Sequence, residues 1–191
     1  MSPAPKLKTV DDLVALGEDA RAELVDGELC GIETSGEHAD AQAGVITEVR
    51  SRVHGPRRDG DGRDTGWWIY AEITIAFNLH DVLRPDVAGW RRDRLPTRPT
   101  GFPVRDIPDW VCEVKSPSTA RRDLIQKRRA YHGAKVGHYW LVDPEQESLT
   151  ALRWSLEGYV IVSVHGPDEL ARIEPFDTFD FPVGVLFGRD L

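Results

Sequence analysis

Cysteine is scarce in this chain, and the spacings that mark common metal and phosphate sites do not occur. There is no Cys-x-x-Cys and no His-x-x-x-His, which excludes the usual zinc sites. There is no glycine-rich phosphate loop and no Gly-x-Ser-x-Gly turn, so the P-loop and hydrolase motifs are also excluded. Repeats and low-complexity tracts are absent as well.

Long hydrophobic runs are also missing. No stretch is long and apolar enough to span a bilayer, so we expect no membrane partner. The start at Met1–Lys6 has no apolar segment behind it, and acidic residues follow soon after, so we expect no export signal and a cytoplasmic location. In that compartment Cys30 and Cys112 should be reduced, buried and not bonded to each other.

A positive charge excess is lacking too. The formal net charge is −8 and the pI is near 5.2, which argues against a general nucleic-acid binder. The arginines are nevertheless clustered, which fits either solvated loop and helix faces or a rim that faces DNA. The clusters are Arg57-Arg58, Arg91-Arg92-Arg94, Arg121-Arg122 and Lys127-Arg128-Arg129.

What is present suits one domain with a sizeable core. The 191 residues are 40% hydrophobic and 29% charged, as in an ordinary globular protein. Residues 1–8 are rich in Pro and Lys and are expected to be a disordered lead, so the predicted domain covers residues 9–191.

The first half of the chain predicts two helices, a hairpin and two long strands. Thr9 can cap the first helix, Asp26-Gly27 is a two-residue hairpin signal, and Gly55-Pro56 ends the second helix. The elements are helix Val10–Leu16, strands Glu23–Val25 and Glu28–Cys30, helix His38–His54, and strands Trp67–Phe77 and Leu83–Trp90, the last two antiparallel.

The second half predicts one more helix between strands. A long Pro-rich loop runs from Arg91 to Pro108, and the turn Ser116–Thr119 caps the helix. The elements are strand Asp109–Lys115, helix Ala120–His132, strand Gly137–Val142, and C-terminal segments Leu149–Trp154, Tyr159–Val164 and Phe176–Phe187. The central order is therefore helix, strand, strand, strand, helix, strand.

Acidic residues occur where strands are predicted to be buried. Alternation places Glu113 and Lys115 on the same face of a strand whose other residues are apolar. Burying a carboxylate and an ammonium is costly unless they have partners, and a divalent metal would be one. Asp86 follows a proline at a strand start, so it is either a turn residue or a second oxygen ligand.

These residues stand in an ordered set that resembles a known family. The set is Glu23-Leu24-Val25-Asp26-Gly27-Glu28-Leu29, His38, Pro85-Asp86-Val87, Glu113-Val114-Lys115-Ser116-Pro117-Ser118-Thr119, Asp123, Lys127, Tyr131 and Tyr139-Trp140-Leu141-Val142-Asp143-Pro144. It is similar to the PD-(D/E)XK nuclease superfamily and, within it, to the Uma2 family of restriction endonucleases. The resemblance covers most of the chain. Many members carry an apolar residue where Lys115 stands, so its presence favours a competent site.

The resemblance implies an α/β fold with a restriction-endonuclease-like αβββαβ core. Its mixed sheet would be flanked by helices, with an extra N-terminal hairpin and extra C-terminal strands. It implies that Asp86, Glu113 and the backbone carbonyl of Val114 bind Mg²⁺, for which Mn²⁺ can substitute. Lys115 would orient the attacking water or help to deprotonate it, and Lys127 would face the site from the following helix.

Three further candidate residues keep two interpretations each. Glu23 is either a ligand or partner in the catalytic site, or an exposed strand acid. His38 is either catalytic or a helix-capping residue, and Glu48 on the same helix is the alternative acid. Lys127 either faces the site or forms a surface ion pair with Asp123, four residues before it.

The expected substrate is DNA. The candidate contacts are Arg91, Arg92, Arg121, Arg122 and Gln126. Most tryptophans, including Trp67, Trp68 and Trp90, should belong to the core, although one at a loop edge could stack on a base. Reaching both strands of a duplex would favour a homodimer.

The sequence therefore predicts a metal-dependent DNA endonuclease of the restriction-enzyme type. Two alternatives stay open. One is a binding or regulatory protein that keeps the fold without the activity, and the other is a metal enzyme that acts on a small substrate.

Overall fold

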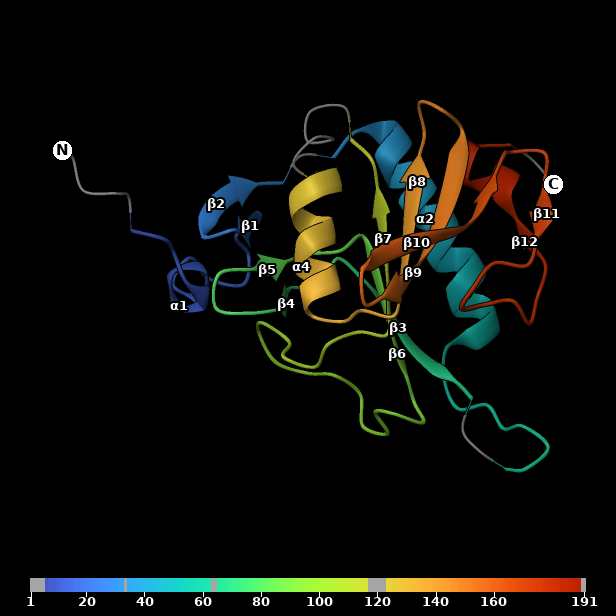
Figure 1. The fold of residues 1–191 in the computed structure, drawn as a ribbon, viewed down its shortest axis with the longest axis horizontal. Coiled ribbons are helices and arrows are strands. Elements are labelled where there is room, and N and C mark those ends of the chain that lie inside the picture. Colours follow the sequence, from blue (N-terminus) through green and yellow to red (C-terminus); the bar gives the residue numbers. More distant parts are fainter. Residues whose placement is uncertain (1–5, 33, 63–64, 117–122, 190–191) are drawn as a thin grey trace.

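The computed structural model describes residues 6–32, 34–62, 65–116 and 123–189. Six strands form one sheet in the order β10-β9-β8-β7-β6-β3, shown in Figure 1. They are β3 (Trp67–Ala71), β6 (Val87–Arg91), β7 (Trp110–Val114), β8 (His138–Asp143), β9 (Ser148–Ser155) and β10 (Gly158–His165). Only β7 and β8 pair in parallel, so the sheet is mixed.

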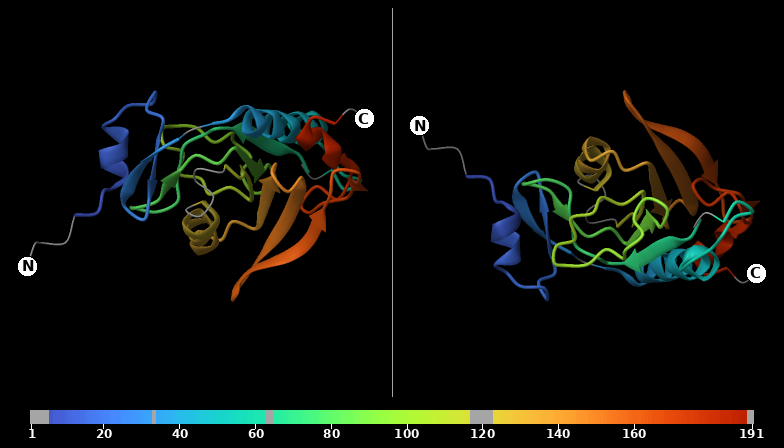
Figure 2. Two further views of the ribbon diagram at one scale, coloured as in Figure 1. Left: turned by 90° about the horizontal axis from the view of Figure 1, so that it is seen from above. Right: turned by 90° about the horizontal axis from the view of Figure 1, so that it is seen from below.

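Helices cover both faces of this sheet. The long helix α2 (Gly36–Val53) lies on one face, and α4 (Arg128–Gly133) lies on the other, as Figure 2 shows from two sides. A π-helix, η1 (Asp123–Lys127), leads directly into α4. These helical segments join the parallel strands β7 and β8, since a parallel pair needs a long crossover connection. The sequence correctly predicts a mixed α/β fold.

A small second sheet lies beside the first. Its order is β2-β1-β5-β4, from β1 (Ala22–Val25), β2 (Glu28–Gly31), β4 (Ile75–Ala76) and β5 (Val82–Leu83). The predicted hairpin is confirmed, with Asp26 and Gly27 at φ 49° and 77°. Both central residues have positive φ, as a two-residue hairpin turn requires. The predicted cap of α1 (Val10–Val14) is also present, because the Thr9 amide donates to Asp12 at 2.9 Å.

The two long strands predicted around residues 67–90 are each divided. Trp67–Phe77 becomes β3 and β4, and Leu83–Trp90 becomes β5 and β6. Glu72 has φ 49°, which extended backbone does not allow, so the first strand ends before it. In the second, Pro85 has no N–H to donate to a neighbouring strand. Both breaks let the chain cross from one sheet to the other, and Asp86 lies at that crossing.

The helices begin and end close to the predicted residues. Helix α2 starts two residues before His38, because Ser35 is the N-cap and its hydroxyl accepts the His38 amide at 3.2 Å. The predicted helix Ala120–His132 is described from Asp123 onward, as η1 and then α4. Residues 1–5 of the predicted disordered lead lie outside the described residues. Near the end of the lead, the Lys8 amide donates to the Gly27 carbonyl at 2.8 Å, so this residue is tied to the hairpin.

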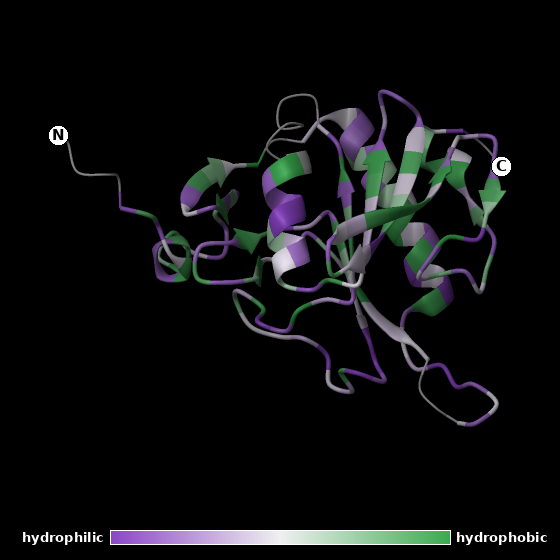
Figure 3. Cartoon of the chain, viewed as in Figure 1, coloured by the Kyte–Doolittle hydropathy of each residue, from purple (hydrophilic) through white to green (hydrophobic). Residues whose placement is uncertain are grey.

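Apolar side chains fill both sides of the large sheet. One core lies between the sheet, α2 and the C-terminal segments, and it contains Val45, Trp110 and Phe176. The other lies under α4 and contains Trp90 and Tyr131. In Figure 3 the loop after α2 is mostly hydrophilic, and its residues 56–62 are exposed.

The C-terminal tail is short and irregular rather than one strand. It holds β11 (Leu170–Ala171), β12 (Phe181–Pro182) and the 3-10 helix η2 (Val183–Phe187), whose apolar residues pack on α2. Among the residues that the structure describes, no helix combines the length and the apolar composition needed to cross a membrane.

The two cysteines are not joined by a disulfide, and they differ in access. Cys112 is fully buried in β7, and burial raises the pKa of its thiol well above the ordinary value, whereas Cys30 is half-buried. We expect a thiol reagent to modify Cys30 in the native protein and Cys112 only after unfolding, because the thiolate is the reactive form. Titration of thiols with and without denaturant would measure this. Fast modification of Cys112 in the native protein would contradict it.

Candidate functional site

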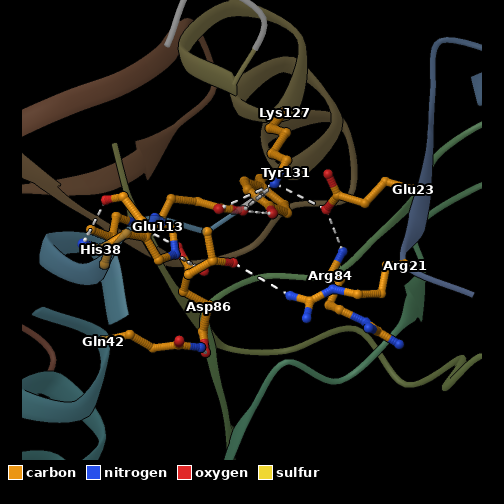
Figure 4. A network of polar contacts seen from close by, with 12 residues as sticks. Arg21, Glu23, His38, Gln42, Arg84, Asp86, Glu113, Lys127 and Tyr131 are labelled. Atoms are coloured by element: carbon orange, nitrogen blue, oxygen red, sulfur yellow. Dashed lines mark hydrogen bonds and ion pairs between the residues drawn. The ribbon is translucent and has the colours of Figure 1, made fainter. Parts of the chain in front are cut away.

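Three carboxylates from three different parts of the fold are buried near one another, and a buried lysine contacts two of them. Glu23 is 3% exposed on β1, Asp86 is 8% exposed before β6, and Glu113 is 4% exposed on β7. Lys127, at the end of η1, is 5% exposed. Figure 4 shows the Lys127 side chain reaching down between Glu23 and Glu113. Sequence reasoning had named all four residues as site candidates, and burial excludes the surface interpretations of Glu23 and Lys127.

Lys127 joins two of these acids. Its ammonium is 2.9 Å from Glu23 Oε1 and 3.2 Å from Glu113 Oε2. Glu23 also accepts the backbone amide of Arg84 at 2.6 Å. The lysine therefore holds the small sheet and the large sheet together at the point where the chain crosses between them.

Tyr131 is the fifth member of this network. It lies one helical turn after Lys127, and residues at that spacing share a helix face. Its hydroxyl donates a hydrogen bond to Glu113 Oε1. Burial and the neighbouring Glu113 raise the pKa of Tyr131 well above its ordinary value, so it remains a donor. The sequence places Tyr131 among the motif residues that carry the resemblance but assigns it no part in the site.

Asp86 is held by contacts on both of its carboxylate oxygens. Oδ1 lies 2.7 Å from His38 Nε2, and Oδ2 accepts the Val114 amide at 2.6 Å. Its backbone carbonyl accepts from Gln42 Nε2 at 2.9 Å. His38 and Gln42 lie one turn apart on α2, so this helix holds Asp86 in position through two side chains.

The Lys115 ammonium forms its ion pairs with acids at the end of β8. Strand β7 ends at Val114, and the next residue lies beside Asp143 of the parallel strand β8. The Lys115 ammonium is 2.8 Å from Asp143 and 4.0 Å from Glu145. The Lys115 amide still donates to the Val142 carbonyl at 2.8 Å, and the buried cation that pairs with Glu113 is Lys127.

Lys115 is nevertheless close to the acid network through His38. The two side chains line one cavity of about 150 Å³, together with Ser35, Glu37, Pro144 and Glu145. His38 is 8% exposed, and within the described part of the chain its Nδ1 is a buried atom without a hydrogen-bond partner. The cavity therefore gives access from solvent to the His38–Asp86 pair, with the Lys115 ammonium in its wall.

Two of the predicted DNA contacts, Arg91 and Arg92, lie away from the acids. Arg91 ends β6, five residues after Asp86, which is about 16 Å along a strand. Arg92 lies over the Trp68 ring at 3.9 Å, and Gln126 is half-buried on η1. Arg121 and Arg122 lie outside the described residues. The alternative acid Glu48 pairs with Arg52 on α2 and takes no part in the network.

The acids repel one another. Burial raises the pKa of Glu113 well above its ordinary value, Lys127 opposes this, and the charges of Asp86 and Glu23 add to it. Lys127 contacts two of the three buried carboxylates and His38 contacts the third, so the acids outnumber the permanently charged cation, and protons or a metal cation would relieve this excess.

Glu113 should make the stability of the metal-free protein depend on pH. A carboxyl whose pKa is raised on folding binds its proton more tightly in the folded state than in the unfolded state. The stabilisation that this gives is complete below the unfolded pKa of about 4.3, and it is lost as pH rises from there through the folded pKa. Glu113→Gln keeps the shape without the charge and should flatten this slope. Urea unfolding in EDTA over a pH series measures it, with Glu157→Gln on an exposed turn as the control. Equal slopes in wild type and Glu113→Gln would contradict the prediction.

The donors present fit a hard divalent cation. Mg²⁺ keeps several waters and usually takes one or two protein carboxylates, so Asp86, Glu113 and the Val114 carbonyl would be enough. The negative excess of the cluster supports such a cation. Among the residues described here, no group of three or more His, Cys, Asp and Glu side chains forms a ready metal centre. Water and substrate oxygens would therefore have to complete the coordination.

Comparison with solved structures places the fold. The crystal structure of a "putative nuclease belonging to DUF820" from Anabaena variabilis superposes with a TM-score of 0.71. It is 20% identical in sequence, and the match covers 94% of this chain and 97% of that one. At this level of identity the match shows a shared fold and nothing more. The mixed sheet with helices on both faces is therefore a known α/β fold.

A match to a protein-family model shows the family to which the chain belongs. Residues 8–184 match the family model Uma2, described as "Putative restriction endonuclease", and the chain belongs to this family. No curated protein sequence matches significantly.

Proposed function

We propose that this protein is a metal-dependent endonuclease that hydrolyses phosphodiester bonds in DNA. The observation that carries the proposal is the buried cluster of Glu23, Asp86 and Glu113, with more negative charge than Lys127 balances. The cluster lies in a chain of a family described as restriction endonucleases.

The order of elements supports a restriction-endonuclease-like core. Counting only the large sheet and its helices, the chain runs α2, β3, β6, β7, η1–α4, β8. This is the αβββαβ order of that fold. Asp86 and Glu113 stand on neighbouring segments of it, since β6 pairs with β7 and the Asp86 carboxylate accepts the amide of Val114.

Hydrolysis of a phosphodiester at this site requires a cation between the carboxylates and the phosphate, because both are negatively charged. Mg²⁺ or Mn²⁺ held by Asp86, Glu113 and the Val114 carbonyl would neutralise charge on the phosphate and supply an acidic bound water. His38 orients Asp86, and Tyr131 orients Glu113. Lys127 balances Glu113 and Glu23, and Lys115 would offset charge on the phosphate from the cavity wall.

DNA reaches this site through the cavity between the start of α2 and the loop after β8. Lys115 is the cation in that wall, and Arg121, Arg122 and Gln126 precede Lys127 in the chain. A homodimer would bring two such sites to the two strands of a duplex. Arg91 and Arg92 would contact DNA only at about 16 Å from the acids.

A plasmid assay tests the proposal. Purified protein should nick supercoiled plasmid with Mg²⁺ or Mn²⁺, and EDTA should stop the reaction. Asp86→Asn and Glu113→Gln should be inactive, which separates the activity from a contaminant. Metal binding without cleavage of any DNA would favour a binding or regulatory protein. Cleavage of a small phosphodiester that DNA does not inhibit would favour an enzyme acting on small substrates.

A further inference from the structure

A second cavity lies at the other end of the large sheet, far from the acids. Its volume is about 680 Å³, within the roughly 300–1,000 Å³ typical of small-ligand sites. Three arginines and three aromatic rings line it, with a few small residues between them. They are Arg52, Arg57, Arg91, Trp67, Phe176 and Phe179.

The cavity is separate from the acid cluster. Arg52 lies fourteen residues after His38 on α2, which is about 21 Å along a helix. Trp67 and Arg91 are paired at one end of strands β3 and β6, and Ala71 and Val87 are paired at the other end, next to Asp86. In Figure 1, α2 (teal) runs from the site end of the sheet to this opposite end.

The aromatic residues form a fixed floor and a more open wall. Trp67 is 6% exposed and Phe176 is 1% exposed, and their rings meet edge to face at 4.9 Å. Phe179 is only partly buried. The Arg52 guanidinium lies over its ring at 5.1 Å, and the Phe176 ring stacks beside it with the centroids 6.3 Å apart. An ion pair with Glu48, one turn earlier, holds Arg52 in that position. A planar ligand ring could stack on this wall.

The arginines have partners that a phosphate could replace. Arg91 pairs with Asp93 at 2.9 Å, but both side chains are about half exposed, and such pairs contribute little. Arg57 is exposed, and one of its contacts, from Nη2 to the Ser51 carbonyl, is long at 3.4 Å. Guanidinium groups bind phosphate through two parallel hydrogen bonds, which makes a phosphate a stronger partner than these contacts. In a chain with a net charge of −8, three arginines around one cavity are a local exception.

We propose that this cavity binds a nucleotide unit, an aromatic base that carries at least one phosphate. The base lies against Phe179, above the floor of Trp67 and Phe176, and the phosphate contacts Arg57 and Arg91. A free nucleotide and a nucleotide within a single DNA strand offer the same chemistry. In either case the site is distinct from the acid cluster and does not depend on a metal.

Calorimetric titration in EDTA tests this, because it removes any contribution of a metal at the acids. The probes are ATP, tripolyphosphate, adenosine and a thymidine oligonucleotide. ATP or the oligonucleotide should bind more tightly than tripolyphosphate or adenosine. Arg57→Ala and Arg91→Ala should each weaken binding about tenfold, the loss typical of a charge-assisted hydrogen bond. Phe179→Leu should weaken it at least about fivefold through lost stacking.

Arg98→Ala is the matched control, because Arg98 is an exposed arginine that does not line the cavity, and it should bind like wild type. Circular dichroism would show that each variant is folded. Tighter ATP binding identifies a free nucleotide as the ligand, and tighter oligonucleotide binding identifies a strand. Failure of both to bind at millimolar concentration would overturn the proposal. So would equal losses in Arg98→Ala, or binding that Arg57→Ala, Arg91→Ala and Phe179→Leu leave unchanged.

Discussion

Lys115→Ala should slow plasmid cleavage by about 10²–10⁴-fold, the range of a lost acid–base or charge contribution. Its ammonium has no lone pair for a metal, so metal affinity should remain near wild type. The fold should also persist, since the side chain stands at the cavity wall and not in a core. The loss should appear in turnover more than in substrate affinity, because the charge acts on the transition state.

Three measurements on matched variants decide this first prediction. Plasmid nicking, circular dichroism and metal titration should separate Lys115→Ala from Glu113→Ala, which should weaken metal binding directly. Lys8→Ala removes one exposed positive charge far from the cavity and should cleave like wild type. If Lys115→Ala cleaves at the wild-type rate, either Lys127 supplies the positive charge or the activity belongs to a contaminant. The role given to Lys115 would then be wrong.

Lys127→Met should lower the free energy of unfolding of the metal-free protein by about 3–5 kcal/mol, the cost of leaving a buried charge unpaired. The substitution leaves Glu23 and Glu113 facing each other without the ammonium between them. For a chain of this length the melting temperature should fall by roughly 10 °C. Part of the loss should return at low pH, where protons neutralise the acids, and part with Mg²⁺, if the cation binds there.

Urea and thermal unfolding in EDTA and in Mg²⁺ would measure this second prediction. Lys8→Met is the control, because the exposed Lys8–Asp12 pair should contribute less than about 1 kcal/mol. Adding Glu23→Gln and Glu113→Gln to Lys127→Met should restore much of the stability, since no unpaired charge remains buried. A Lys127→Met protein as stable as wild type in EDTA would show that the lysine is not needed to balance the acids.

The two lysines thus have separable effects. Lys127 is 5% exposed and contacts two acids, so its loss should be seen first in stability. Lys115 is partly exposed at the cavity and contacts Asp143, so its loss should be seen in turnover. Asp143→Asn would release Lys115 from its present partner and show whether that ion pair positions it for the reaction.

Local signals predicted the elements that carry the site. Asp26-Gly27 predicted the hairpin that holds Glu23, because few residue pairs allow two positive φ angles. The apolar strand around Glu113 and the helical spacing of Val45, Val49 and Val53 were equally local patterns, and both elements are present. Such features depend on a few neighbouring residues, which is why the order of elements could be obtained from the chain.

These local signals could not predict which side chains contact one another in the folded protein. Alternation predicted Lys115 on the same face as Glu113, but it could not predict that Asp143 of β8 would pair with the Lys115 ammonium. Lys127 reaches Glu113 from a π-helix, and the resemblance alone had pointed to it. Tyr131 was missed as a donor, although its spacing from Lys127 placed both on one helix face.

By itself the sequence determined the class of fold, the order of its elements and the acids that the fold buries. The hydrophobic pattern, the turns and the motif residues are all properties of short segments. Only the tertiary structure decided which cation meets Glu113, that Asp86 stands where the chain crosses between two sheets, and that Arg91 joins Arg52 and Arg57 at the far end. These depend on strand register and on how α2 and α4 lie across the sheet, and those contacts join residues far apart in the chain.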